Sequence, residues 1–402
     1  MANRRRRKPK YWTEGGIDIP FLAMVIALVV IGLLMMFSAS YSYCVHYFGD
    51  GLYYFKRQLV FVIIGVGVML WVSRFDYEQW KLWAYPLLIL TYILLILVLV
   101  VNRGEDFKRW LPLGPLTFQP SEIAKFSLVL FLAMHEARHY KGIINQTPYI
   151  GPNGRINART NLVSLGIYGA LIFSMCLLVY EENHVSGTIL LFLLGLLMIY
   201  LAGYSNKGFA IAVALVVLAA IIVVSNPDNL PGHAQQRIEV WHHPDKDPKG
   251  TRWQTNHGLY AIGSGGFFGV GIGNSHMKQL YVSEPQNDFI FTIVTEELGF
   301  LGAVLILILF GLLVWRGFFI GVHAKDQFGG LLAMGLISQV GIQTVLNVDV
   351  VTEVLPNTGI SLPFFSYGGT SLLMLLFEMG IILSVSRKAH IKKPQTQRRE
   401  KS

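Results

Sequence analysis

The sequence predicts an all-α, polytopic membrane protein with ten transmembrane helices and one large extracytoplasmic loop at about residues 225–287. Hydrophobic residues make up 53% of the 402 residues and charged residues only 14%, whereas a soluble domain carries about 25% charged residues. Apolar runs of about 20 residues, the length that crosses a bilayer, recur along the chain. These runs are continuously apolar rather than alternating, so we expect helices, which satisfy their own backbone groups inside the bilayer.

The expected spans follow from these apolar runs and lie, to within several residues at each end, at 17–38, 57–73, 81–101, 121–135, 160–180, 185–203, 208–225, 288–315, 328–348 and 367–386. The fourth run is short for a span, so we expect it to extend back toward Pro120. The spans form one membrane domain at residues 17–390, flanked by basic tails at 1–16 and 391–402. Because ten is an even number, both tails lie on the same side of the membrane.

The distribution of basic residues predicts that both tails are cytoplasmic. In this orientation most of the 33 lysine and arginine residues lie in the tails and in short cytoplasmic loops, as the positive-inside rule requires. The net charge of +9 is therefore a topology signal and does not indicate a nucleic acid partner.

Residues 17–40 are long enough to span and lack a small-residue cleavage site, so we expect a retained first helix rather than a signal peptide. Two cysteines, Cys44 and Cys176, do not make a disulfide framework.

Three loops are expected on the outer side, at residues 102–120, 225–287 and 349–366. They are the loops richest in glycine, proline, tryptophan and charged residues. Functional residues concentrate in loops that a rigid scaffold holds. The working face of the protein is therefore predicted to be the extracytoplasmic one.

The segment at 103–125 brings charged residues to the point where an outer loop enters the fourth span. Pro120, followed by Ser121 as an N-cap candidate, is typical of a helix start. Glu122 and Lys125 then fall three residues apart on one helix face. Ionisable residues inside a span are costly and indicate function by default, although these two can also form a purely structural pair.

Arg109 and Trp110 lie in the outer loop just before that span. The guanidinium of Arg109 is planar and permanently charged, which suits a phosphate group. Together with Glu122 and Lys125 it is a candidate site for an anionic head group. Trp110 is either part of that site or an aromatic anchor at the membrane interface.

The long outer loop contains two recognisable segments. Residues 234–244 are expected to form a short amphipathic interfacial helix with Ile238 and Trp241 buried. Residues 258–273 are dense in glycine, but no Gly-Lys-Ser/Thr follows, so they are not a phosphate-binding loop. We expect these glycines to allow tight turns against the helix bundle or a ligand. The histidines of the loop show no zinc spacing.

Asp288 follows the helix-breaking Pro285 and is expected to start a span at the outer water boundary. On a helix it would share a face with Thr292 and Glu296. A carboxylate in this position is either a helix cap, which the helix dipole favours, or a general base in a partly dry cleft. Spacing alone leaves both interpretations open.

Two other segments complete the outer half. Glu296 and Glu297 lie deeper in the same span, and we expect them to form interhelical pairs rather than to take part in chemistry. The stretch at 356–369 contains Pro356 and Pro363, which make it stiff, and we expect it to wall a cavity.

Four motifs in the chain together resemble the SEDS family of bacterial cell-wall polymerases, the FtsW, RodA and SpoVE group. In order, they are RWLPLGPLTFQPSEIAK, YAIGSGGFFGVGIGNS, NDFIFTIVTEELGFLG and PNTGISLPFFSYGGTS. The resemblance covers about residues 17–390. The fourth motif resembles the division and sporulation members more than the elongation member.

The resemblance implies a peptidoglycan glycosyltransferase in the bacterial cytoplasmic membrane. Such an enzyme polymerises lipid II on the outer face by an inverting reaction and releases undecaprenyl diphosphate. The resemblance also implies one catalytic carboxylate, Asp288, and a set of residues that bind the substrate: Arg109, Trp110, Gln119, Glu122 and Lys125. The implied partners are lipid II, a class B penicillin-binding protein that acts as transpeptidase, and other division or elongation proteins. No cofactor is identified, and a divalent cation, Mg or Mn, is left open.

Two departures and two alternatives qualify this expectation. Residues 182–188 read ENHVSGT where many relatives carry Gln-Pro-Asp-x-Gly-Thr, and His257-Gly258 replaces Gln-Ser; neither change removes Asp288. The alternative functions are a lipid II flippase and a non-catalytic scaffold that recruits a transpeptidase. A flippase predicts a path of polar residues to the cytoplasmic side, whereas the charged positions here cluster in the outer half.

Overall fold

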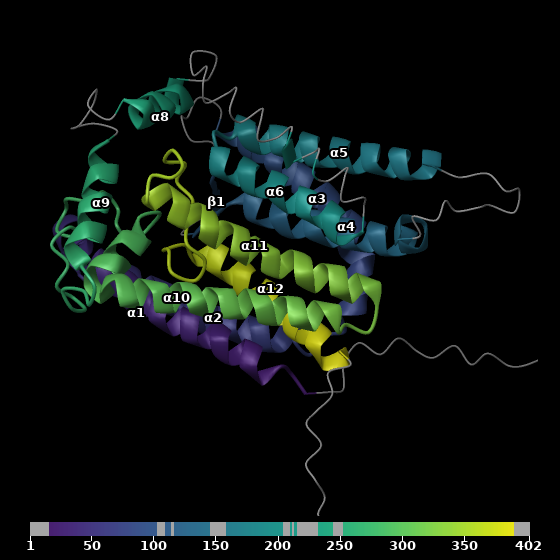
Figure 1. Cartoon of the computed structure of the whole chain (residues 1–402), viewed down its shortest axis with the longest axis horizontal. Coiled ribbons are helices and arrows are strands. Elements are labelled where there is room, and N and C mark those ends of the chain that lie inside the picture. Colours follow the sequence, from purple (N-terminus) through teal and green to yellow (C-terminus); the bar gives the residue numbers. More distant parts are fainter. Residues whose placement is uncertain are drawn as a thin grey trace, which may run out of the picture.

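The computed structural model describes residues 16–102, 109–113, 116–144, 158–203, 210, 213–214, 232–243 and 252–389. It is a bundle of long helices that run roughly alongside one another, with two short helices, α8 and α9, at one end (Figure 1). The long helices are α1 (Ile19–Phe48), α2 (Tyr53–Val72), α3 (Trp80–Val101), α4 (Pro120–Ile144), α5 (Ala158–Glu181), α6 (Val185–Leu201), α10 (Ile290–Val322), α11 (Gln327–Val351) and α12 (Gly369–Lys388). The smaller elements are the 3-10 turn η1 (Tyr77–Gln79), the antiparallel strands β1 (Leu111–Leu113) and β2 (Leu116–Phe118), α8 (Gly232–His242) and α9 (Trp253–Gly265).

Six of the described helical segments are long and apolar enough to cross a membrane. They are α1, α2, the continuous segment of η1 and α3, α10, α11 and α12. Two shorter apolar helical stretches lie at Leu165–Glu181 and Val185–Leu201. These helices confirm the predicted all-α membrane class, while the count of ten spans stays a prediction. The expected span at 208–225 lies almost entirely outside the described residues.

Several helix ends differ from the predicted ones, because caps and backbone turns decide them. Helix α1 continues past residue 38 to Phe48 and stops at Gly49, whose φ of 69° lets its N–H bond back to the carbonyl of Val45. Helix α4 starts at Pro120, as expected. Ser121 therefore lies inside the first turn and is not its N-cap.

Ion pairs tie together one end of the bundle. Arg316, near the end of α10, binds Asp18, the N-cap of α1, with an N–O distance of 2.7 Å. Lys388, at the end of α12, binds Asp76 in the α2–α3 turn at 2.5 Å. The start of α1, the α2–α3 turn and the ends of α10 and α12 therefore share one end. This arrangement of helix starts and ends agrees with the predicted order in which the chain crosses the membrane. The side of the membrane that each end faces stays a prediction.

The glycine-dense segment packs into a break in α10. Gly299 has a φ of 69° inside this helix, so the helical hydrogen bonds are interrupted there. Residues 266–271 supply the missing partners, since the N–H groups of Phe300 and Val270 bond to the carbonyls of Gly266 and Glu296 at 2.9 and 3.0 Å. A Cβ atom on Gly299 would lie 2.2 Å from the backbone nitrogen of Gly269. The glycines thus allow close packing against the bundle, the first of the two roles predicted for them.

The sequence predicts interhelical pairs for both Glu296 and Glu297; Glu297 contacts α1 in this way, whereas Glu296 bonds to the loop after α9 instead. The carboxylate of Glu297 accepts hydrogen bonds from the hydroxyl of Ser38 on α1 and from Nζ of Lys278, both at 2.7 Å. Glu296 accepts a bond from the hydroxyl of Ser275 and one from the backbone N–H of His276. All of these oxygens are buried, and their partners satisfy them as buried charges require. The two glutamates therefore fasten the loop after α9 to α10 and α1.

Replacement of Gly299 by alanine should destabilise the protein by about 2 kcal/mol or more, because the new Cβ would meet backbone and the residue would keep a positive φ. The measurement is the thermal unfolding of the purified protein in detergent. Gly67 on α2 is the matched control, since nothing lies within 4 Å of a Cβ built there. Equal unfolding temperatures for Gly299→Ala and Gly67→Ala would contradict the packing described above.

Candidate active site

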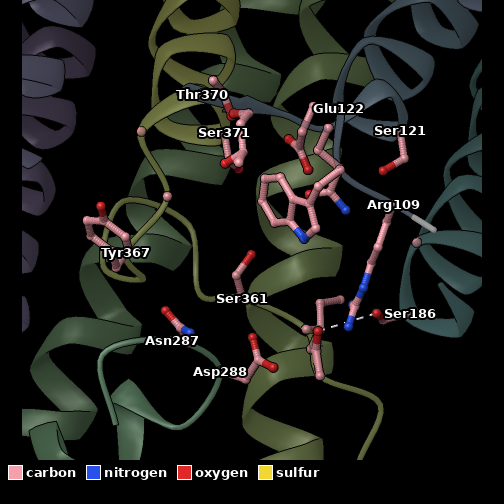
Figure 2. Close-up of a pocket in the computed structure, with 18 of the residues that line it drawn as sticks. Arg109, Ser121, Glu122, Ser186, Asn287, Asp288, Ser361, Tyr367, Thr370 and Ser371 are labelled. Carbon is pink, nitrogen blue, oxygen red and sulfur yellow. Dashed lines mark hydrogen bonds between the residues drawn. The ribbon is translucent and has the colours of Figure 1, made fainter. Parts of the chain in front are cut away.

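A cavity of about 650 Å³ opens at the end of the bundle opposite the ion pairs. Its lining comes from α2, the β1–β2 hairpin, α4, α6, the segment before α10, α11 and the loop before α12 (Figure 2). Every residue that the sequence singled out for catalysis or substrate binding lines it: Arg109, Trp110, Gln119, Glu122, Lys125 and Asp288. Segments far apart in the sequence thus form one site.

The β1–β2 hairpin positions the first two of these residues. Leu111 pairs with Phe118 and Leu113 with Leu116, so the chain doubles back and brings residue 109 close to the start of α4. The side-chain amide of Asn102, at the end of α3, donates a hydrogen bond of 2.8 Å to the carbonyl of Trp110. Trp110 itself is 38% exposed, which leaves its ring available both to the cavity and to the surroundings.

Glu122 and Lys125 form an ion pair in the wall of the cavity. Nζ of Lys125 lies 2.8 Å from Oε1 of Glu122, and both side chains are at least nine-tenths buried. The predicted structural pair therefore exists, and both partners line the cavity as well. The pairing and the binding of an anionic ligand are compatible, because a lysine has three donors and this pair uses one of them.

Asp288 lies on the non-helical segment just before α10. The N-cap of that helix is Phe289, which makes no side-chain cap bond. Asp288 is therefore not the helix cap, and it does not share a helical face with Thr292 and Glu296. Figure 2 shows its carboxyl group reaching into the same space as the side chain of Arg109.

The amide of Asn347 on α11 holds this segment in place. Its Nδ2 donates to the carbonyl of Asp288 at 2.8 Å and to that of Ile360 at 2.7 Å. Ser366 and Tyr367 add bonds from their hydroxyl and N–H groups to the carbonyls of Asn287 and Gln286, at 2.9 and 2.8 Å. The sequence reasoning missed Asn347, and an asparagine in an apolar run was the only signal for it.

The loop at 356–369 walls the cavity, as predicted. Gly359 has a φ of 71°, and a Cβ atom on it would lie 2.9 Å from Oδ2 of Asp288. A glycine is therefore needed both for the backbone turn and for room beside the carboxylate. The hydroxyl of Ser186 on α6 donates to the carbonyl of Gly359 at 3.4 Å, which ties the loop to the other side of the cavity.

Two arginines act on the charge of Asp288. Burial raises the pKa of the Asp288 carboxyl above its ordinary value, and the guanidinium groups of Arg109 and Arg237 oppose that shift. Arg237 comes from α8 and donates to the carbonyl of Asn357 at 3.2 Å. Sequence reasoning placed an amphipathic helix here but did not connect it with Asp288. Its prediction that Ile238 is buried is confirmed, whereas Trp241 is only half-buried.

The turn at 182–188, where the chain departs from the expected motif, also reaches the site. Asn183 adopts a positive φ of 57°, and Glu182 beside it is fully buried. Burial raises the pKa of Glu182 to about 8, and Arg109 opposes the shift. Burial, helped by the charges of Arg109 and Lys125, lowers the pKa of His184 to about 3, so this imidazole is neutral. Its Nδ1 lies 3.3 Å from Nε2 of Gln119.

Within the described part of the chain, no group of three or more histidine, cysteine, aspartate or glutamate side chains is arranged to hold a metal ion. The positive charge at the cavity instead comes from the side chains of Arg57, Arg109 and Lys125.

Comparison with known proteins places this architecture among relatives. A family model described as cell cycle protein, for FtsW, RodA and SpoVE, matches residues 19–391. The chain is 37% identical over 376 residues to stage V sporulation protein E of Bacillus subtilis (strain 168), covering 92% of this chain and 97% of that protein. It is 35% identical over 387 residues to a probable peptidoglycan glycosyltransferase FtsW of Trichlorobacter lovleyi, covering 94% and 95%.

Two solved structures share the fold. The first is a chain in the structure titled "Structural coordination of polymerization and crosslinking by a peptidoglycan synthase complex", and it is 27% identical to this chain. Its TM-score is 0.72, with 92% of this chain and 98% of that chain covered. The rod shape determining protein RodA of Thermus thermophilus is 26% identical, with a TM-score of 0.65 over 94% of this chain and 99% of that chain.

The raised pKa of Glu182 predicts a pH-dependent stability. Since the carboxyl has a pKa of about 8 in the folded protein and an ordinary value of 4.5, the folded state holds this proton more tightly, so stability falls as pH rises from the ordinary value and levels off above about 8. The unfolding temperature of Glu182→Gln should therefore fall less than that of the wild type between about pH 5 and pH 8. Glu181→Gln, at the exposed neighbouring residue, should behave like wild type. Identical pH dependence in all three proteins would refute this assignment.

Proposed function

This chain belongs to the FtsW, RodA and SpoVE family of cell cycle proteins, and we propose that it is a peptidoglycan glycosyltransferase that polymerises lipid II. The observation that carries the proposal is the cavity, in which the carboxylate of Asp288 lies with the cations Arg57, Arg109 and Lys125 and with the carboxylates of Glu122 and Glu284. Relatives at 32–35% identity bear the name probable peptidoglycan glycosyltransferase FtsW. The reaction occurs on the outer face of the bacterial cytoplasmic membrane, with both chain ends in the cytoplasm.

Lipid II carries a disaccharide-peptide on an undecaprenyl diphosphate, so its polymerisation joins one sugar to the next. Asp288 accepts the proton of the acceptor 4-hydroxyl as that oxygen attacks the anomeric carbon of the donor. The new carbon–oxygen bond forms as the bond to the diphosphate breaks, and undecaprenyl diphosphate leaves with the electron pair. Attack from the opposite face converts an α-linked donor into a β-1,4 link, which is an inversion.

The surroundings of Asp288 suit a general base. Burial raises the pKa of its carboxyl, so the carboxylate binds a proton more strongly. This shift favours catalysis, because a general base is most efficient when its pKa lies near the working pH. Arg109 and Arg237 act in the other direction and favour the ionised form that the reaction needs. The backbone bond from Asn347 keeps the carboxylate in the cavity before the substrate arrives.

The leaving group requires positive charge rather than a proton donor. A diphosphate is already a good anion, and fixed cations stabilise the charge that develops on it. Arg109 and Lys125 provide that charge from the hairpin and α4 sides of the cavity. Gln119, Glu122 and Trp110 line the same wall and orient the substrate. One carboxylate suffices here, because the pair that glycoside hydrolases use serves a poorer leaving group.

The partner class follows from the relatives. One matching structure is titled as a complex that coordinates polymerization and crosslinking, which supports pairing with a class B penicillin-binding protein that crosslinks the strands. Similarity to stage V sporulation protein E and to FtsW proteins supports a role with the division or sporulation machinery.

A flippase would share the charged cavity but would need a polar route through the membrane domain. In the described part of the chain, the end of the bundle opposite the cavity is occupied by ion pairs such as Asp18–Arg316 and Asp76–Lys388. This arrangement favours an enzyme that works from one side. Glycan synthesis by the purified protein alone discriminates the enzyme from both a flippase and a scaffold.

Replacement of Asp288 by asparagine should abolish the base and lower the rate of lipid II polymerisation by roughly 10² to 10⁴-fold. The assay uses purified protein, lipid II and separation of the glycan products by length. Asp349→Asn is the matched control, since this carboxylate lies near the same end of the bundle but does not line the cavity. Normal polymerisation by a folded Asp288→Asn protein would rule out the base.

Removal of the cations should weaken lipid II binding and also lower turnover, because the diphosphate is already charged when it binds and gains charge as it leaves. We expect Arg109→Ala to raise the apparent KM for lipid II by on the order of tenfold, because a hydrogen bond to a charged group is lost. For Lys125, the double variant Glu122→Gln with Lys125→Met removes both charges and avoids a buried, unpaired glutamate. Lys325→Ala, exposed at the other end, is the control. Unchanged KM in both site variants would remove these residues from the binding site.

A further inference from the structure

A dense group of aromatic residues lies beside the cavity and has no part in the chemistry above. The 19 residues from 37 to 55, at the end of α1 and the start of α2, contain eight phenylalanine and tyrosine residues. We call the following six side chains the tyrosine-rich surface: Tyr43, Tyr47, Phe48, Tyr53, Tyr54 and Tyr367. Five of the six carry a hydroxyl group.

The rings form a continuous path that begins inside the cavity. Tyr367 lines the cavity, and its ring centroid lies 4.3 Å from that of Tyr54. Tyr54 contacts Tyr43 at 6.2 Å, and Tyr43 contacts Tyr47 at 4.4 Å. A second branch runs from Tyr54 to Phe48 at 5.5 Å. The path ends at Tyr47 and Phe48, which are 60% and 45% exposed.

Arg57 gives the path a charged edge at the cavity. Its guanidinium carbon lies 4.7 Å from the centroid of the Tyr53 ring, and its side chain lines the cavity. Tyr53 in turn stacks on Phe48 at 4.2 Å. Aromatic, hydroxyl and charged groups therefore occur together on the way out of the cavity.

Hydrogen bonds and an ion pair define the turn between α1 and α2, which carries these rings. Gly49 closes α1, and the carboxylate of Asp50 accepts a bond of 2.9 Å from the N–H of Leu52. The same carboxylate pairs with Lys56 at 2.8 Å. A preorganised surface loses little conformational entropy when it binds a ligand.

The surface differs from the aromatic residues at the opposite end of the bundle. There the exposed rings include the tryptophans Trp71, Trp83 and Trp315, between 56% and 60% exposed, and also Tyr85 at 46%. Such rings are typical of an anchor at the membrane interface. Near the cavity the rings are instead mostly tyrosines, in contact with one another and with a cavity residue.

We propose that the tyrosine-rich surface, which leads out of the cavity from Tyr367 to Tyr47 and Phe48, binds the glycan strand as it leaves the site. The proposal rests on the proposed function, because a polymerase must hold its product close to Asp288 for the next addition. Each sugar ring of the strand has a face of C–H groups, which packs on an aromatic ring, and hydroxyl groups, which bond to tyrosine. A lipid chain would use the rings but not the hydroxyl groups.

The test measures binding of a soluble glycan octasaccharide, of alternating N-acetylglucosamine and N-acetylmuramic acid, to the full-length protein in lipid nanodiscs. The double variant Tyr47→Ala with Phe48→Ala should bind it roughly tenfold more weakly, since two exposed ring contacts are lost. Trp315→Ala is the control and should bind as wild type does. In the polymerisation assay, the double variant should also yield shorter strands, and Tyr47→Phe, which keeps the ring but loses the hydroxyl group, should give a length between those of the double variant and the wild type.

The outcomes separate this proposal from the proposed function. Wild-type octasaccharide binding and strand length in the double variant would overturn the glycan site and leave the rings as an interfacial anchor. If the wild-type protein binds the octasaccharide with the expected variant dependence but makes no polymer, the glycosyltransferase proposal fails while the glycan site stands. Equal loss in Trp315→Ala would also overturn the site, because it would show a general effect of removing exposed rings.

Discussion

The amide of Asn347 joins the two non-helical segments on which the candidate active site depends. It bonds at once to the carbonyl of Asp288 and to that of Ile360. Non-helical backbone at membrane depth is tolerated only where protein partners or an aqueous cavity satisfy its polar groups. With this bond in place, the 356–369 loop lies against the start of α10, and Gly359 can approach the carboxylate of Asp288. This side chain on α11 therefore helps to fix both segments that bring Asp288 and Gly359 together.

The two ends of the bundle differ in how their charged residues are arranged. At the end opposite the cavity, acidic and basic residues neutralise one another in pairs, such as Asp18 with Arg316. Around the cavity the charges are mixed, since Arg57, Arg109 and Lys125 line it together with Glu122, Glu284 and Asp288. Arg109 and Arg237 both favour the ionised form of Asp288. Fixed cations in such a site can stabilise an anionic ligand, in agreement with a diphosphate-linked substrate.

The turn at 182–188, where the sequence departs from the expected motif, contributes polar groups to the site. Glu182, His184 and Ser186 each contact it. His184 approaches Gln119, Ser186 bonds to Gly359, and Glu182 interacts with Arg109. The neutral imidazole of His184 adds no charge beside Lys125. The turn therefore places a carboxyl group, a neutral imidazole and a hydroxyl group beside the cations of the cavity.

The sequence by itself determined the membrane class, most of the helices and the candidate site residues, because apolar length and charge distribution are properties of contiguous residues. Family motifs then selected Asp288 from two interpretations that spacing left open. Only the tertiary structure decided that Asp288 lies outside α10, and that Arg237, Glu182 and Asn347 belong to its surroundings. The same holds for the contact between Gly299 and Gly269. Each of these contacts joins residues from separate elements, and no local pattern of hydrophobicity or charge records which elements will meet.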